Sequence, residues 1–109
     1  HSAEEEIFVV LGGGGTVTVW PHPSSDHEPG RWESGNETHE IRAGHTVASP
    51  AGTGRPLSLQ AGADGMRVLA FGTRDPNDIA YYPRSGKVSL RGVGVIGRIE
   101  QLDFHDGED

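Results

Sequence analysis

The sequence predicts an all-β protein, and three features point to this class. Short runs of β-branched, aromatic and other apolar residues recur along the chain, several alternating with polar residues. Glycine and proline are frequent, with 17 and 7 residues among 109, and they fall between these runs. No stretch has the length and apolar period of a long helix. Short strands separated by turn residues are typical of a β-sandwich or barrel, so we expect one domain over residues 1–109.

The first half of the chain predicts two hairpins. The expected strands are 6–11 and 16–20, joined by a glycine turn at 12–15, and 39–42 and 46–49, joined by a turn at 43–44. Residues 21–38 contain three prolines and many polar side chains, and they predict a long loop at the surface or at a barrel mouth.

The second half predicts four further strands and one helical turn. A tight turn at 50–54 precedes the expected strands 56–60, 66–72, 87–90 and 95–102, with residues 61–65 linking the first two. Asp75 and Pro76 occupy the cap and first position of a helical turn over 75–79. Residues 103–109 form an acidic tail that we expect to fray.

The predicted core follows from alternation within the β-rich runs, because successive side chains of a strand point to opposite faces. The residues expected to be buried are Phe8, Val10, Val17, Val19, Val47, Leu57, Leu59, Val68 and Ala70. The glutamates at 4 and 5 stand in an acidic run and are expected to be mostly exposed.

Composition excludes some partners. The formal net charge of -7 and the scattered nine basic residues argue against binding to nucleic acid, which needs clustered Lys and Arg, and against an anionic membrane surface. The sequence has no run of about 18 apolar residues that could cross a bilayer. With no cysteine it fits a reducing compartment, and we expect a cytoplasmic protein.

Two motifs carry a family resemblance. His1, Glu6 and Gly13 match the end of a pattern of His-x-His, four residues, Glu, six residues, Gly. Gly44 is followed after five residues by Pro50-Ala51-Gly52. Together they resemble the two motifs of the cupin superfamily, and the run 70–87 is similar to small bacterial cupins. The resemblance implies a double-stranded β-helix, a jelly-roll barrel, with one or two strands missing before the first motif. Residues 6–11 would then border an open sheet edge, which we expect an upstream segment or another chain to cover.

In cupins the two motifs supply two histidines, a glutamate and a third histidine to a metal ion. By this resemblance His1 and Glu6 are metal ligands, and the implied cofactor is a divalent transition metal such as Zn, Mn, Fe or Ni, bound weakly or not at all. The histidine of the second motif would fall at Arg55 or at Leu57, neither of which is an ordinary metal ligand. The first histidine would lie upstream of His1.

Each candidate has a plainer explanation. His1 is nearly as well explained as a terminal residue without a fixed place, or, if it is a mature terminus, as a copper chelator through its amino group and ring. Glu6 fits a solvent-facing acidic run. Arg55 and Leu57 are candidate ligand-binding residues, Arg55 for a carboxylate or phosphate, although a surface arginine after a turn is common. Tyr82 belongs to a stretch, 81–84, that is expected either to cover the barrel mouth or to pack on the outer sheet.

Two functions follow. The favoured one is a cupin barrel that binds a small molecule or anion and has a degenerate or weak metal site. The alternative is a metal-dependent cupin enzyme, of isomerase, epimerase or dioxygenase type, acting on a small polar substrate. Cupins of this kind pair through sheet faces and strand edges, so we also expect a homodimer, with 95–102 as an edge candidate.

Overall fold

The computed structural model describes residues 1–21, 35–100 and 102–108, and it is all-β with antiparallel sheets. Its strands are β1 Glu6–Val19, β2 Glu37–Arg42, β3 Thr46–Ser49, β4 Leu57–Gly72, β5 Ile79–Tyr82, β6 Lys87–Leu90 and β7 Val95–Arg98, with a short 3₁₀ helix at Arg91–Val93. The all-β prediction is therefore confirmed. Most of the predicted loop at 21–38 lies outside the described residues, and its last two residues belong to β2.

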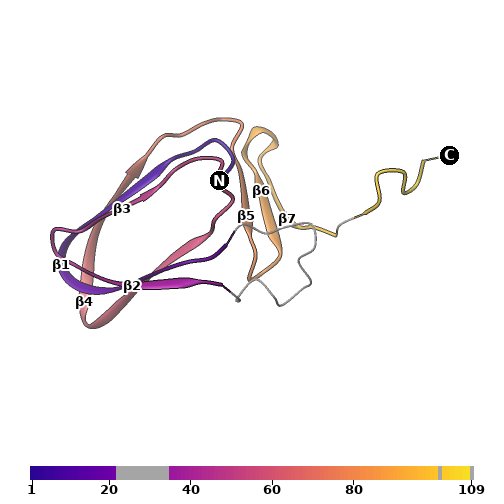
Figure 1. Ribbon diagram of the computed structural model, residues 1–109. Helices are drawn as coiled ribbons and strands as arrows, with labels where there is room; N and C mark the ends of the chain where they lie inside the picture. The colour runs from indigo at the N-terminus through magenta and orange to yellow at the C-terminus, as the bar shows by residue number, and fades with distance from the viewer. Residues whose placement is uncertain (22–34, 101, 109) are drawn as a thin grey trace.

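Strands β1 to β4 form one bent sheet, which we call the curled sheet. The β4 strand pairs with β1 from end to end except at residues 62–65, whereas β2 and β3 follow one another along the other side of β1. Figure 1 shows that β1 and β4 turn back on themselves at the end of the molecule away from β5, so the sheet makes two layers with an open end. The pairings among the described residues do not close this sheet into a barrel.

The prediction of a turn at glycines 12–15 is wrong, because these residues lie within the continuous strand β1. These glycines let the strand bend while its backbone stays against β4. A Cβ at Gly15 would lie 2.0 Å from the carbonyl oxygen of Gln60, and one at Gly13, where φ is 68°, would lie 2.1 Å from that of Gly65. The glycines are therefore required for close approach of two strands rather than for a hairpin turn.

Two other predicted breaks are also corrected. Residues 61–65 belong to the continuous strand β4 and take up the register shift opposite the bend of β1. The predicted hairpin 39–42 with 46–49 does not form, since β2 pairs with residues 14–19 of β1 and β3 with residues 6–9, on opposite sides of the bend. The segment that connects β2 to β3 is hydrogen-bonded to β1: Gly44 N–H donates to the Val10 oxygen, and Val10 N–H donates to the His45 oxygen.

This topology also corrects the expectation that residues 6–11 border an open sheet edge. Phe8 pairs with Val47 on one side and with Ala70 on the other, so β1 is the central strand.

The core lies between the two layers of the curled sheet. Val10 and Val17, both predicted, are buried together with Ile41, which was not. Val19, Val47, Leu57, Leu59 and Met66 pack around them and are partly buried. Phe8 and Val68 are also only partly buried. Ala70 was predicted to be buried and is exposed; it lies near the end of β4 and does not belong to the cluster.

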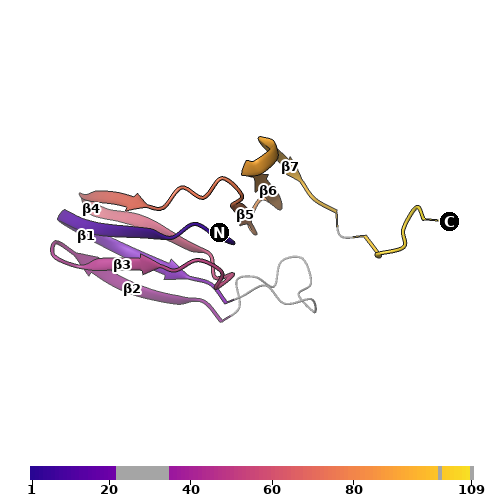
Figure 2. The same cartoon turned by 90° about the horizontal axis from the view of Figure 1, so that it is seen from above.

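Strands β5, β6 and β7 form a second, small sheet that stands across the open end of the curled sheet (Figures 1 and 2). The predicted helical turn before it is a single hydrogen-bonded turn, in which Asp75 accepts from the N–H of Asn77 at its side chain and from that of Asp78 at its backbone oxygen. β7 ends at Arg98, earlier than predicted. Residues 102–108 are exposed and extend away from both sheets.

The small sheet and the residues that follow it expose several apolar side chains. Exposed apolar side chains there and just beyond it are Val93, Val95, Ile96, Ile99 and Leu102. The homodimer predicted through this edge stays a prediction. Within the described residues, no helix has the length and apolar character needed to span a bilayer.

Candidate functional site

A cavity of about 580 Å³ lies where the small sheet meets the open end of the curled sheet. Its apolar wall contains Phe8, Trp20, Pro56, Leu57, Leu59 and Ala80. Charged and hydroxyl-bearing side chains stand among these, from the residues before β1, the turn before β4, and the β5–β6 hairpin. A mostly apolar cavity with a few polar groups is the usual form of a small-molecule site.

All five residues predicted as site residues line this one cavity: His1, Glu6, Arg55, Leu57 and Tyr82. The β1–β3 pairing brings the two motifs together, since Glu6 lies opposite Ser49 in the register. Beyond it, the N–H of Gly52 in the Pro-x-Gly turn donates to the carbonyl oxygen of His1 at 3.1 Å. Gly52 has a φ of 75°, a conformation that favours glycine at this turn.

His1 and Glu6 face each other across a short gap. Nε2 of His1 lies 3.8 Å from Oε1 of Glu6, and the two side chains are 28% and 36% exposed. An imidazole nitrogen and a carboxylate oxygen form a donor set that suits divalent transition metals. With only two protein donors, the other coordination positions would have to be filled by water or by a bound ligand.

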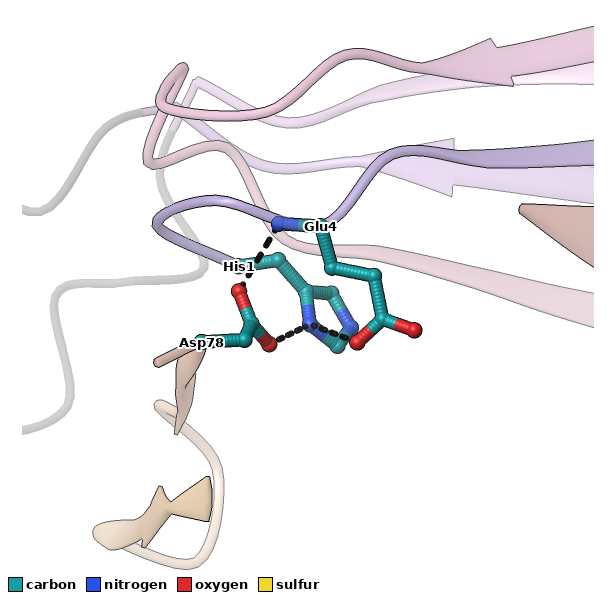
Figure 3. A group of neighbouring side chains, drawn as sticks. All are labelled: His1, Glu4 and Asp78. Carbon is teal, nitrogen blue, oxygen red and sulfur yellow. Dashed lines mark hydrogen bonds and ion pairs between the residues drawn. The ribbon is translucent and has the colours of Figure 1, made fainter. Parts of the chain in front are cut away.

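The other ring nitrogen of His1 is engaged by Asp78, which comes from the turn before β5 (Figure 3). The distance from Nδ1 to Oδ2 of Asp78 is 2.6 Å, and the Asp78 side chain is 2% exposed. Its second oxygen, Oδ1, accepts hydrogen bonds from the backbone N–H groups of Ala3 and Glu4, both at 2.9 Å. One buried carboxylate thus fixes the imidazole and the backbone that carries it.

Asp78 remains ionised despite its burial. Burial by itself raises the pKa of this carboxyl, but two backbone hydrogen bonds and the positive charges of the His1 amino group and of Arg91 outweigh it. The pKa of Asp78 is therefore lowered from its ordinary value of 3.8.

The expectation that Glu4 is mostly exposed is wrong, because Glu4 is buried, whereas Glu5 is exposed as expected. Oε2 of Glu4 lies 2.7 Å from Nη2 of Arg91 and 3.7 Å from Nδ1 of His1. Arg91 also donates to the backbone oxygen of Asp75. The pairing with Arg91 compensates the charge of a carboxylate that would otherwise be costly to bury.

Ligand atoms of His1, Glu4 and Asp78 lie within 4.8 Å of one another, close enough to share a metal ion. However, Asp78 already has three hydrogen-bond partners and Glu4 contacts a guanidinium, which would repel a cation. The Nε2 side of the ring, which opens to the cavity with Glu6, is the better place for a cation.

Two arginines gather around Trp20, which also lines the cavity. Nε of Arg55 donates to the backbone oxygen of Trp20 at 3.3 Å, and the guanidinium of Arg84 lies 5.8 Å from the centre of the Trp20 ring. Both arginines also line the cavity, where their positive charge favours a negatively charged group.

Leu57 and Tyr82 have different surroundings. Leu57 pairs with Val19 and is partly buried, so it presents an apolar side chain to the cavity. Tyr82 lies on β5, is 45% exposed, and has the Lys87 ammonium 5.3 Å from its ring centre. Residues 81–84 all line the cavity, on the side of the small sheet.

Sequence reasoning missed Asp78, Glu4 and Arg91. Asp78 is the third residue after the cap residue Asp75, and an aspartate in a turn is most simply read as a turn former. Its contacts reach residues 1, 3 and 4, which are far away in the sequence. The remaining described histidines do not join the site: His45 accepts from the Arg42 N–H, His39 is exposed beside Glu37, and His105 is exposed beside Phe104. His22 and His27 lie outside the described residues.

Comparison with known proteins found no matching family model, no matching curated protein and no matching solved structure.

Proposed function

We propose that this chain is a cupin-type binding protein that holds a small organic anion in the cavity, next to a weakly bound divalent transition metal at His1 and Glu6. One observation carries the proposal: Nε2 of His1 and Oε1 of Glu6 lie 3.8 Å apart on the wall of a cavity that also contains Arg55. A cation position and an anion position therefore share one apolar chamber.

The charge balance supports a cation. Three carboxylates, from Glu4, Glu6 and Asp78, lie around one imidazole. The positive charges described beside them are those of Arg91 and of the His1 amino group, which do not balance all three. A divalent ion between His1 and Glu6 would reduce the excess negative charge. When bound, such an ion supplies a Lewis acid that polarises an oxygen of the ligand.

The binding is expected to be weak. Two protein donors leave most of the coordination sphere to water or ligand, and Leu57 contributes an apolar wall instead of a further nitrogen. Loss of an outer hydrogen-bond partner alone costs about 10–100-fold in metal affinity, so loss of a direct ligand should cost at least as much.

The anion is supported by Arg55 and Arg84 beside Trp20, and by the apolar residues that line the rest of the cavity. Guanidinium groups recognise carboxylates through paired hydrogen bonds. The volume of the cavity is within the range of small-molecule sites. A small carboxylate with an apolar or hydroxylated body fits this chemistry.

Titration calorimetry with Mn²⁺ and Zn²⁺ tests the metal. Glu6→Ala should abolish binding, whereas Glu5→Ala should not change it, because Glu5 precedes the same strand and is exposed. Leu57→His should strengthen binding by adding a nitrogen to the cavity wall. Tight stoichiometric binding that survives Glu6→Ala would place the metal elsewhere and contradict the proposal.

A panel of small carboxylates tests the anion through the shift in melting temperature. The stabilising acids should lose their effect in Arg55→Ala and keep it in Arg98→Ala, a matched control on the exposed strand β7. A carboxylate whose effect is the same in both variants would show that it binds outside the cavity.

A second candidate is an enzyme of the isomerase or epimerase type. The observation that favours it is the pairing of His1 with buried Asp78, with Nε2 open to the cavity, an arrangement suited to accept a proton from a ligand. An acid found in the binding panel, incubated with the protein in deuterated water, should then exchange a carbon-bound proton. Absence of exchange above the rate in His1→Gln would leave the binding function alone.

A further inference from the structure

The two nitrogens of the His1 ring face different surroundings. Nδ1 meets Oδ2 of buried Asp78 at 2.6 Å, with Oε2 of Glu4 further away at 3.7 Å. Nε2 meets Oε1 of Glu6 at 3.8 Å, on the cavity side. Only the Nδ1 contact is a hydrogen bond, so one side of the ring is held and the other is available.

Asp78 is itself held in place. Its Oδ1 accepts from two successive backbone N–H groups, those of Ala3 and Glu4, and its side chain is 2% exposed. The carboxylate can therefore neither rotate nor turn to solvent without leaving buried donors unpaired. A carboxylate accepts but does not donate, so the proton in the 2.6 Å contact belongs to Nδ1 of His1.

We infer that Asp78 is a positioning residue that fixes His1 in the tautomer with its proton on Nδ1, so that the unprotonated Nε2 faces Glu6 and the cavity. The inference deepens the proposed function and rests on it, because this tautomer leaves Nε2 and Glu6 as two electron-pair donors that face one gap. Such a pair repels in the absence of a cation between them. A ligand that coordinates the same cation from the cavity would lie on the Nε2 side of the ring, because Asp78 occupies the Nδ1 side.

The tautomer can be measured without any metal. In protein labelled with ¹⁵N-histidine, the protonated and unprotonated ring nitrogens differ in shift and in their couplings to the ring carbon-bound protons. The signals of His1 are identified by their loss in His1→Gln, and spectra are recorded at increasing pH until the shifts no longer change. We expect the wild-type ring to carry its proton on Nδ1.

Asp78→Asn is the decisive variant. Its amide oxygen can still accept from Ala3 and Glu4, but its NH₂ group must donate to Nδ1 and so drive the His1 proton to Nε2. Affinity for Zn²⁺ should then fall about 10–100-fold. Glu4→Gln, which changes the more distant carboxylate, should leave the proton on Nδ1. Unchanged signals of His39 and His45 serve as the check that the sheets remain folded.

A wild-type ring protonated on Nε2, or an Asp78→Asn ring still protonated on Nδ1, would overturn the inference. Should Asp78→Asn fail to fold, the wild-type spectrum decides by itself. The expected tautomers together with no binding of Zn²⁺ would uphold the role of Asp78 and refute the metal part of the proposed function, so the two failures are distinct.

Discussion

The two sheets of this protein are held by different forces. The curled sheet has an apolar cluster between its layers, with Val10, Val17 and Ile41 buried at its centre. At the small sheet, the described link to the residues before β1 is polar: Ser2 and Ile79 exchange hydrogen bonds, and Asp78 accepts from Ala3 and Glu4. The first sheet depends on packing and the second on directed bonds and charge.

This difference places the cavity at a polar junction. Cavity residues come from both sheets, so its shape depends on how firmly the small sheet is attached. Regions of a protein can open separately when few apolar contacts connect them to the rest. Changes in the curled sheet should therefore affect the whole fold, whereas changes at Asp78 should mainly loosen the small sheet and the site.

Gly15→Ala is expected to have the largest effect. The new Cβ would meet the carbonyl oxygen of Gln60, which is part of the backbone of β4 and cannot move aside. We expect a loss of about 3 kcal/mol or more in unfolding free energy, at the upper end of the cost of overpacking. Urea denaturation measures it. Gly97→Ala is the control, since no atom lies within 4 Å of a Cβ there, and an equal loss in both variants would contradict the explanation.

Asp78→Ala should cost slightly less in total and act locally. It leaves the backbone N–H groups of Ala3 and Glu4 without their acceptor. Only the Glu4 bond is fully buried, and an unpaired buried donor costs about 1–3 kcal/mol, whereas water can reach the half-buried Ala3 N–H. Hydrogen exchange should become faster in β5 to β7 and in residues 1–5 while the centre of β1 keeps its protection. Uniformly faster exchange in both sheets would mean that they unfold as one unit.

Val10→Ala tests whether the packing of the curled sheet supports the whole fold. Val10 is 1% exposed, and truncating a fully buried valine should remove about 2 kcal/mol. The midpoint of urea unfolding should fall for both sheets, because the curled sheet supports the small one. Val93→Ala, at a residue that is 71% exposed, should leave the midpoint within experimental error. A loss confined to the small sheet would reverse the assignment of forces.

The smallest effect is the pH dependence contributed by Asp78. The pKa of this carboxyl is lower in the folded protein than its ordinary value of 3.8, so the unfolded chain binds the proton more readily. The stability that Asp78 contributes is therefore fully present above 3.8 and is lost as pH falls through its folded pKa. Urea midpoints of wild type and Asp78→Asn, taken from neutral pH downward, should converge in acid. Parallel curves would show that Asp78 does not titrate in this way.

Part of the fold and of the candidate site could be predicted from the sequence. Alternation predicted most of the strands, although not β5, and the inward side chains of Val10 and Val17. The two motifs indicated His1, Glu6, Arg55 and Leu57, which line one cavity in the structure. The bend at Gly12–Gly15 could not be predicted in this way, because a glycine turn and a glycine-rich bend under a neighbouring strand have the same local pattern.

The sequence by itself determined that the chain is all-β, because the alternation of apolar and polar residues is a local property. It also indicated the candidate site residues in the two motifs, because these follow from the spacing of the motifs. Only the tertiary structure decided that β1 and β4 are continuous, that Glu4 is buried against Arg91, and that Asp78 contacts His1. The physical reason is the same in each case. The partner lies far away in the sequence, and whether a glycine bends or a carboxylate is buried depends on which atoms it meets there.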